Sequence, residues 1–370
     1  MKRFNCSICN NQLKHIYSLQ NMPIKLSCID TPETNTSNLS FSQCIFCNTI
    51  QLDKLIPLNI LYSQSHNYTS VGKVWDGYFK LFCDLFTPIV SNKIILEIGD
   101  PSGKIANRIN GFDKWYIVEP NKNSNIIFKD NIEFIEGFFD SNFKIDKRID
   151  IIAHSHLFEH IYEPNQFLTN CYELLTPSGE MFFGVPNMEH IGTNALCPFL
   201  GVFFEHTIFL NKQNITYLLE SNGFEIVNIY DYLSHSTIYH AKKINKTNQI
   251  DVVPINNFNN LFTETLHTYT DFITNTNNIL ISSNLPVYIF GASYNSQIIL
   301  ALGLNQENIY GILDNCVDKH NKYLYGYNLK IFSPCILKDQ NSIVVLKNGY
   351  YVEEIKSQLL GINSNTIIIS

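Results

Sequence analysis

The residues best suited to binding a ligand lie in a glycine-bearing turn after a hydrophobic segment. The turn reads EIGDPSG, from Glu97 to Gly103, and the preceding KIIL has the character of a buried strand. Glycine permits a tight turn and a close approach of the backbone to a ligand. A helix N-terminus just beyond the turn would offer free backbone amides. Glu119 ends the next predicted strand, 20 residues after Gly99, where a Rossmann unit places the acid that holds ribose hydroxyls.

The cofactor that this pattern favours is S-adenosylmethionine. The third glycine of a dinucleotide fingerprint is missing from the turn, which disfavours NAD. We expect Glu97, Gly99, Gly103 and Glu119 to bind the cofactor. The alternative is an ordinary strand-to-helix turn in some other α/β protein, and Glu119 with the later segments makes that alternative the weaker one.

Histidines gather in the segment HSHLFEH, which follows a further predicted strand. His154 and His156 fall at the carboxyl end of that strand, where open α/β sheets bind ligands. We expect His156 to line the cofactor pocket. For Glu159 and His160, a packing or capping role before the next helix is favoured over catalysis.

Four cysteines form two C-x-x-C pairs, Cys6 with Cys9 and Cys44 with Cys47. Such pairs indicate metal binding rather than disulfides, and a Cys₄ zinc site has no open position for chemistry. We therefore predict a structural zinc ion. The gap between the pairs is longer than in common zinc ribbons, and accidental clustering of thiols is the disfavoured alternative.

A histidine with an adjacent carboxylate follows the fifth predicted strand, in the segment Phe203-Phe204-Glu205-His206. A neighbouring carboxylate raises the pKa of a histidine, and such a histidine can act as a general base. The alternative is a structural histidine before the next helix. The local sequence by itself slightly favours that alternative.

The elements that must position these residues alternate between strand and helix. The predicted strands are KIILEIG, WYIVEP, NIEFIEG, DIIAHSH and GEMFFGVP, and the predicted helices are PNQFLTNCYELL and NKQNITYLLESNGF. Asn211 is expected to cap the second helix. This alternation predicts a doubly wound, Rossmann-like α/β core.

A second alternating unit follows the polar segment KKINKTNQIDVVPINN and a helical pattern. It contains the turn Phe290-Gly291-Ala292-Ser293, a weak nucleotide-binding signal with a single glycine. We predict three domains: a zinc-binding domain over residues 1–60, the cofactor-binding core with a leading helix over 61–245, and a smaller C-terminal Rossmann-like α/β domain over 246–370.

Composition excludes several classes of protein. The 370 residues carry a net charge of −7, and the 26 Lys and Arg are scattered, whereas nucleic-acid binders usually show a basic face. No apolar run reaches the roughly 18 residues of a membrane span, and the N-terminus lacks an apolar signal core. We expect a cytoplasmic protein that acts on a small molecule. The sequence gives no indication of its oligomeric state.

Taken together, these motifs resemble the S-adenosylmethionine-dependent sugar C-methyltransferases, which act on deoxysugar nucleotides. The two cysteine pairs are similar to that family's N-terminal zinc-binding domain. The turn from Glu97 to Gly103, Glu119 and the segment LFEH are similar to its class I methyltransferase core. FGASYNSQIILALGL, ILDN and YLYGYNLKIFSP are similar to its C-terminal α/β domain. The resemblance covers nearly the whole chain in order.

The resemblance implies a reaction and the residues that carry it. The family's Tyr-His-Glu-His segment holds its proposed base. Here Glu205 and His206 are retained, whereas Phe203 and Phe204 replace the tyrosine and the first histidine. It implies His206 as the base, Glu205 as its orienting partner and Tyr68 as a hydrogen-bond donor, in C-methylation of a nucleotide-linked keto-deoxysugar through an enolate.

Three alternatives remain open. The first is an O- or N-methyltransferase that acts on a sugar or small metabolite. The second is an NAD(P)-dependent enzyme that uses the C-terminal unit, which the single glycine there disfavours. The third is a non-catalytic nucleotide-binding protein, which the retained glycines and Glu119 disfavour.

Overall fold

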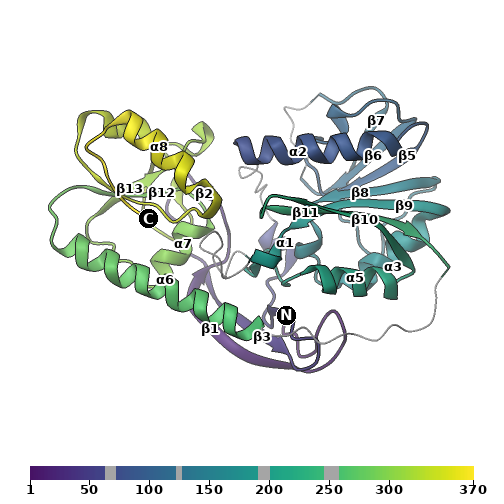
Figure 1. Ribbon diagram of the computed structural model, residues 1–370, viewed down its shortest axis with the longest axis horizontal. Helices are drawn as coiled ribbons and strands as arrows, with labels where there is room; N and C mark the ends of the chain where they lie inside the picture. Colours follow the sequence, from purple (N-terminus) through teal and green to yellow (C-terminus); the bar gives the residue numbers. More distant parts are fainter. Residues whose placement is uncertain (63–71, 122–126, 191–200, 246–257) are drawn as a thin grey trace.

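Three larger sheets follow one another along the described part of the chain in the computed structural model (Figure 1), and a further pair of strands connects the first and the last of them. The structure describes residues 1–62, 72–121, 127–190, 201–245 and 258–370. Tyr68, the predicted hydrogen-bond donor, lies outside these described residues. The predicted domain boundaries after residues 60 and 245 fall between successive sheets.

The largest sheet has seven strands in the order β10-β11-β9-β8-β5-β6-β7. Neighbouring strands from β5 to β9 are parallel, and β11 runs antiparallel to both β9 and β10. The bounds are β5 (Ile94–Ile98), β6 (Lys114–Glu119), β7 (Ile132–Glu136), β8 (Ile149–Ser155), β9 (Leu175–Pro186), β10 (Phe224–Tyr232) and β11 (Ser236–Lys243). The predicted Rossmann-like core is confirmed. The β10–β11 hairpin was not predicted, because the mostly exposed edge strand β10 carries polar and apolar residues without a clear pattern.

Helices cover both faces of this sheet. In Figure 1, α2 (Lys73–Phe86) lies on one face, and α3 (Pro164–Leu174) and α5 (Lys212–Ser221) lie on the other. The predicted helix cap is confirmed, since the Asn211 side chain accepts a hydrogen bond of 2.9 Å from the Asn214 backbone N–H. This bond satisfies one of the free amides at the helix start.

The N-terminal residues form a three-stranded antiparallel sheet, and the short helix α1 (Leu58–Leu61) follows it. The strands of this sheet are β1 (Leu13–Pro23), β3 (Thr36–Cys44) and β4 (Ile50–Leu52). Strand β4 also pairs with the segment that follows His206. The Leu52 N–H donates to the Thr207 carbonyl at 2.9 Å, and the Phe209 N–H donates to the Ile50 carbonyl at 2.8 Å. The N-terminal sheet therefore holds part of the larger domain as a further strand.

The C-terminal residues form a parallel five-stranded sheet in the order β15-β13-β12-β16-β17. The strands are β12 (Val287–Phe290), β13 (Ile309–Leu313), β15 (Ile331–Phe332), β16 (Ile343–Val345) and β17 (Ile367–Ile369), and the helices are α6 (Phe258–Ile281), α7 (Tyr294–Ala301) and α8 (Val352–Ile362). A two-stranded pair of β14 (Tyr323–Leu324) with β2 (Cys28–Ile29) joins this part to the N-terminal residues.

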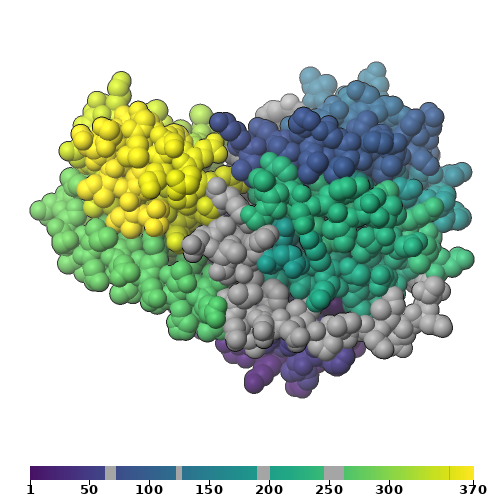
Figure 2. Space-filling model, viewed as in Figure 1, coloured from purple at the N-terminus to yellow at the C-terminus, as the bar shows by residue number. Residues whose placement is uncertain are grey.

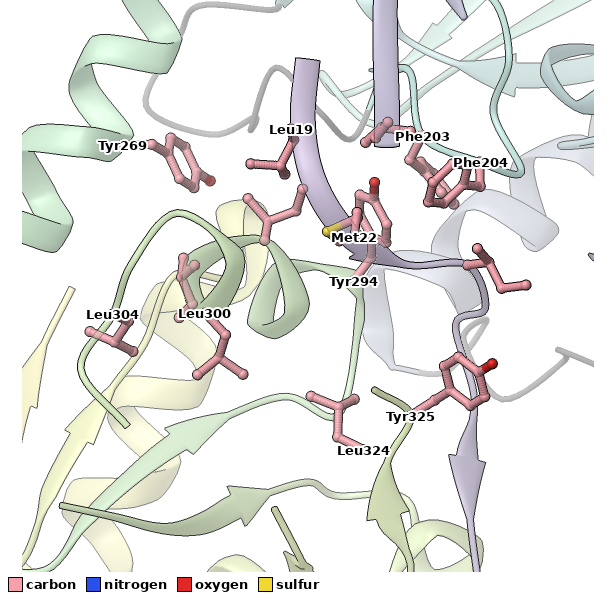
Figure 3. Close-up of a cluster of buried hydrophobic side chains, with 14 of the residues drawn as sticks. Leu19, Met22, Phe203, Phe204, Tyr269, Tyr294, Leu300, Leu304, Leu324 and Tyr325 are labelled. Atoms are coloured by element: carbon pink, nitrogen blue, oxygen red, sulfur yellow. The ribbon is translucent and has the colours of Figure 1, made fainter. Parts of the chain in front are cut away.

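One hydrophobic core is shared by the three parts of the chain. Figure 3 shows Leu19 and Met22 of β1 between α7 of the C-terminal part and the segment that carries Phe203 and Phe204. All of these side chains are buried. Because the parts share a core, their relative position is fixed by packing rather than by linkers alone. Among the described residues, no helix is long and apolar enough to cross a membrane.

Candidate functional site

A cavity of about 1420 Å³ lies between the seven-stranded and the five-stranded sheets. Its wall includes Gly99 after β5, Glu119 at the end of β6 and His156 after β8. Its opposite wall includes Gly291 after β12 and residues of α8. Figure 2 shows these two parts of the molecule as adjacent masses. Both sheets thus turn their carboxyl ends toward one cavity, where open α/β sheets bind ligands.

The turn after β5 depends on glycine at two positions. Gly99 has φ +82° and Gly103 has φ +58°, and both values lie in the region that favours glycine. A Cβ on Gly99 would lie 2.9 Å from Leu157 Cδ1, and one on Gly103 would lie 2.5 Å from Phe128 Cε1. Gly99 lines the cavity. Gly103 is not among the described lining residues and lies against Phe128, so its contact with a cofactor stays a prediction.

The helix expected directly after this turn is absent from the described structure. The 3₁₀ turn Ala106–Arg108 stands there instead. The Asp100 carboxylate accepts hydrogen bonds from the backbone N–H groups of Ser102, at 2.8 Å, and Lys104, at 2.6 Å. These two amides are therefore already used within the turn. The helix that was expected to offer free amides here is replaced, in the described residues, by the 3₁₀ turn.

Two acids of the predicted cofactor site occupy different environments. Glu119 lines the cavity, accepts a hydrogen bond of 2.9 Å from the Asn121 N–H, and has its pKa raised by burial to about 7. Glu97 is fully buried, where burial raises its pKa well above the usual value, and Trp115 Nε1 donates to it at 2.9 Å. Glu97 is not among the described residues that line the cavity. Its contacts are those of a residue that fixes the sheet beneath the turn.

His156 lies in the cavity wall, where we predicted it, and a network of hydroxyl groups fixes its ring. Its Nδ1 lies 3.2 Å from Ser155 Oγ, and its Nε2 lies 3.1 Å from Ser236 Oγ. The Trp75 ring packs edge-on against it, with 4.7 Å between centroids. Burial is the largest of the causes that lower the pKa of His156 well below its usual value, so this imidazole is neutral near pH 7.

His154 has a purely structural environment. It is completely buried, its ring stacks on Phe183 with 4.6 Å between centroids, and burial lowers its pKa to about 3. Neither ring nitrogen has a hydrogen-bond partner in the described part of the chain. Residues two apart in a strand would share a face, but His156 follows the end of β8 with φ +51°, so it departs from the strand geometry and has different surroundings from His154.

A second histidine pair lies further along the same cavity wall. The rings of His160 and His206 are 4.7 Å apart. Glu159 Oε1 lies 3.8 Å from His160 Nε2 and 3.7 Å from His206 Nε2. A hydrogen bond of 2.8 Å joins the Tyr62 hydroxyl to His160 Nδ1. Burial raises the pKa of Glu159 to about 8.

The segment from Phe203 to His206 is anchored by aromatic packing. The Phe203 ring lies 4.2 Å from the His206 ring and 4.3 Å from the ring of Tyr294 on α7. Phe204 is 2% exposed in the shared core. Glu205 is buried in the cavity wall, and its charge contributes to a raised pKa of Tyr62, for which burial is the main cause.

Sequence reasoning assigned packing or capping to Glu159 and His160, but the structure brings both beside His206. No role was predicted for Tyr62, although its hydroxyl lies 2.8 Å from His160 Nδ1. The position of His160 just beyond the carboxyl end of β8 was a usable signal, since ligands bind at that edge. No local signal relates Glu159 to His206, which is 47 residues away.

The four cysteines of the two C-x-x-C pairs converge at one end of the N-terminal sheet. The Sγ atoms of Cys6 and Cys47 are 3.6 Å apart, those of Cys9 and Cys44 are 3.5 Å apart, and all four lie within 4.8 Å of one another. Zinc–thiolate bonds of about 2.3 Å in a tetrahedron place sulfur atoms at nearly these separations. Gln51 Nε2 donates to Cys6 Sγ at 3.1 Å, a support typical of the groups around a metal site.

The glycine turn of the C-terminal sheet also reaches the cavity. Gly291 has φ +97° and lines the wall. Asp314, at the end of the neighbouring β13, accepts from the Ala292 N–H at 2.8 Å and from Lys319 Nζ at 3.0 Å. This acid is already neutralised by a buried lysine. It therefore cannot hold ribose hydroxyls as freely as Glu119 can, which disfavours an NAD-type site here.

Comparison with known proteins places the methyltransferase signature in the middle of the chain. Residues 76–229 match a family model described as a methyltransferase domain. A protein of Mycolicibacterium smegmatis, named as a probable S-adenosylmethionine-dependent methyltransferase, is 32% identical over 81 residues. That match covers 22% of this chain and 30% of the relative. The chain therefore spans less than a third of the length of the curated relative it matches.

Solved methyltransferase structures also align with part of this chain. The N-methyltransferase NodS of Bradyrhizobium japonicum aligns over 46% of this chain and 97% of its own, with 13% identity and a TM-score of 0.37. The magnesium protoporphyrin IX methyltransferase of Synechocystis aligns over 46% of this chain and 85% of its own, with 11% identity and a TM-score of 0.37.

The family match covers the seven-stranded sheet from β5 into β10, together with α3 and α5. The seven-stranded sheet is formed by these residues and by the β10–β11 hairpin that extends beyond them. Within this sheet, β11 runs antiparallel to its neighbours. Residues 76–229 therefore match a methyltransferase domain, and the sheet that they form has the Rossmann-like class I methyltransferase fold.

Proposed function

We propose that this protein is an S-adenosylmethionine-dependent methyltransferase that methylates a carbon atom of a nucleotide-linked keto-deoxysugar. The observation that carries the proposal is the position of His206, which lies in the wall of the cavity that also contains Gly99 and Glu119. A potential base and the predicted cofactor residues thus share one enclosed space. The sequence resemblance supplies the class of substrate.

The residues around the turn after β5 fit the proposed cofactor. Gly99 presents backbone without a side chain, and the Glu119 carboxylate stands at the end of the adjacent strand, where it would hold the ribose. His156 and Trp75 would border the part of the cofactor nearest to the acceptor. When bound, S-adenosylmethionine supplies an electrophilic methyl carbon. The protein must then align the acceptor and make it nucleophilic.

The dimensions of the cavity support a large second ligand. Single small-molecule sites usually occupy roughly 300–1,000 Å³, and this cavity measures about 1420 Å³. Its far wall carries polar side chains of the C-terminal part, among them Asn295, Asn315 and Gln358. A sugar linked to a nucleotide would extend from the histidine pair toward these groups.

In this proposal His206 acts as the general base. A proton next to a sugar carbonyl leaves the carbon, the electron pair forms an enolate, and His206 takes the proton. His160 and Tyr62 stand on the same wall as potential donors to the enolate oxygen. Glu205 and Tyr68 remain predicted participants. An acceptor oxygen or nitrogen would need only positioning or a simple deprotonation, which is the rival reaction.

We also propose that Cys6, Cys9, Cys44 and Cys47 hold one structural zinc ion. Their sulfur separations fit tetrahedral coordination. The site lies beside β4, which pairs with the segment after His206. In this role the metal would stabilise the support of the active site without taking part in the reaction.

Metal analysis tests the zinc proposal. The purified protein should contain about one equivalent of zinc. The double variant Cys6→Ser, Cys44→Ser should lose the metal and melt at a lower temperature. The exposed Cys335 provides a matched control, and Cys335→Ser should keep both metal and stability. A metal-free native protein, with the double variant equally stable, would show that the thiols cluster without a metal.

Calorimetry with S-adenosylhomocysteine tests the cofactor site. Glu119→Ala should weaken binding by about 1–3 kcal/mol, because a hydrogen bond to a charged group is lost. Glu136 ends the neighbouring strand β7 and is exposed, so Glu136→Ala should bind normally. Equal affinity of the Glu119 variant and the native protein would refute the assignment.

Product analysis tests the reaction. With a 4-keto-deoxysugar nucleotide, His206→Ala should lose about 10²–10⁴-fold in rate, the usual contribution of a positioned base, and should still bind the cofactor. His267 on the exposed side of α6 serves as the control. NMR of the product decides the class of acceptor: a new methyl group on oxygen or nitrogen would exclude C-methylation. Full activity of His206→Ala would assign that histidine a structural role.

A further inference from the structure

We propose that Glu159 is a positioning residue shared by His160 and His206, and that the three side chains work as one acid–base unit. The chemical role of these three residues rests on the proposed function. The choice of Glu159 as the acid rests on contacts in the structure. The sequence points to Glu205, the chain neighbour of His206, whereas the contacts point to Glu159.

The first argument is distance. One oxygen of Glu159, Oε1, lies 3.8 Å from Nε2 of His160 and 3.7 Å from Nε2 of His206. A single carboxylate oxygen therefore faces both imidazoles, and a shift of less than about 1 Å brings either nitrogen into hydrogen-bond range. This makes Glu159 a common partner rather than the partner of one histidine.

The second argument is burial. Glu159 is 1% exposed, while the side chains of His160 and His206 are 18% and 16% exposed. The two histidines line the cavity, and the carboxylate lies behind them. Neither carboxylate oxygen has a hydrogen-bond partner in the part of the chain that the structure describes. A buried charge without a partner is costly, so Glu159 is ionised only when a nearby imidazole carries a proton.

The third argument is that hydrogen bonds fix the positions of the three residues relative to one another. The Thr207 N–H donates to the Glu159 carbonyl at 2.9 Å, and the Phe203 N–H donates to the His206 carbonyl at 2.7 Å. The Tyr62 hydroxyl fixes His160 from the other side through Nδ1. The unit thus has a rigid frame, and it reaches the cavity at two points.

The unit gives the base a path for its proton. In the resting unit Glu159 is an anion paired with a protonated His160. When His206 removes a proton from the substrate carbon, the electron pair stays on the substrate as the enolate and His206 becomes a second cation beside Glu159. His160 then releases its proton into the cavity beside Tyr62, and the proton on His206 passes through Glu159 to His160, which restores the unit. No oxidant, reductant or further reactant is needed.

Other ionisable groups surround the unit and must be considered in any titration. Tyr62 follows α1, Tyr78 lies on α2, and His156 follows β8. Glu205 lies in the segment after β9. Burial keeps both tyrosines protonated and His156 neutral near pH 7. Glu205 is thus the other acid that must be tested.

NMR titration of the cofactor-free protein with labelled histidine and glutamate side chains tests the proposal. In the native protein, the resonances of His160, His206 and the Glu159 carboxyl group should move together over one pH range, as coupled sites do. In Glu159→Gln, both histidine midpoints should shift to lower pH by about 1 unit or more, since loss of a nearby negative charge has this size. Glu159→Asp retains a carboxylate and should keep the joint titration.

Glu205→Gln is the matched control, because it removes another buried carboxylate from the same wall. It should leave the joint titration in place. If neither histidine, or only one, responds to Glu159→Gln, the shared role is overturned. If Glu159→Gln does not fold, independent titration of the three groups in the native protein overturns it equally well.

Two further measurements separate this proposal from its rivals. Cobalt added to the zinc-replete protein should not bind at this unit. A stoichiometric cobalt ion that is lost in Glu159→Gln would instead assign the three residues to a metal site and overturn the acid–base role. Activity of Glu159→Gln on a keto-sugar nucleotide should fall, with an altered pH profile of kcat. Absence of any sugar methylation by the native protein would refute the proposed function and leave the titration result intact.

Discussion

The pairing of β4 with the segment after His206 is the contact on which the geometry of the site depends. Two backbone hydrogen bonds, of 2.9 and 2.8 Å, hold residues 207 and 209 against β4, and a third, of 2.9 Å, joins Thr207 to Glu159. This segment leaves the sheet after β9 and has no regular structure of its own near His206. Because β4 supplies a template for it, the position of His206 is set by the N-terminal sheet as much as by the methyltransferase domain.

The same strand connects the cysteine cluster to the histidine pair. The Gln51 side chain on β4 donates to Cys6 Sγ at 3.1 Å and accepts from the Ser7 N–H at 3.0 Å. On the other side of the cluster, Asn165 of α3 donates to the Ser7 and Ile8 carbonyls at 2.9 and 3.1 Å. A metal-held loop would thus be clamped to the methyltransferase domain beside the candidate site.

Local patterns in the sequence predicted the features that depend on local structure. The Asn211 cap, the five parallel strands and the positions of Gly99 and Glu119 all follow from periodicity and turn chemistry. The contacts among Glu159, His160 and His206 depend on a chain segment returning from 47 residues away, and the bond from Tyr62 to His160 spans 98 residues. Contacts between residues so far apart in the chain cannot be inferred from one sequence.

The two phenylalanines before Glu205 pack in apolar surroundings. Phe204 is buried in the core that β1 and α7 share (Figure 3). Phe203 lies 4.2 Å from the His206 ring and 4.3 Å from the Tyr294 ring. The packing of Phe203 connects His206 to Tyr294 of α7, and a tyrosine or histidine could not fill these apolar sites without a hydrogen-bond partner for its polar group. The C-terminal part therefore supports His206 through Tyr294, in addition to closing the far wall of the cavity. A change in how that part packs would move His206, so the three sheets must be assembled before the site is complete.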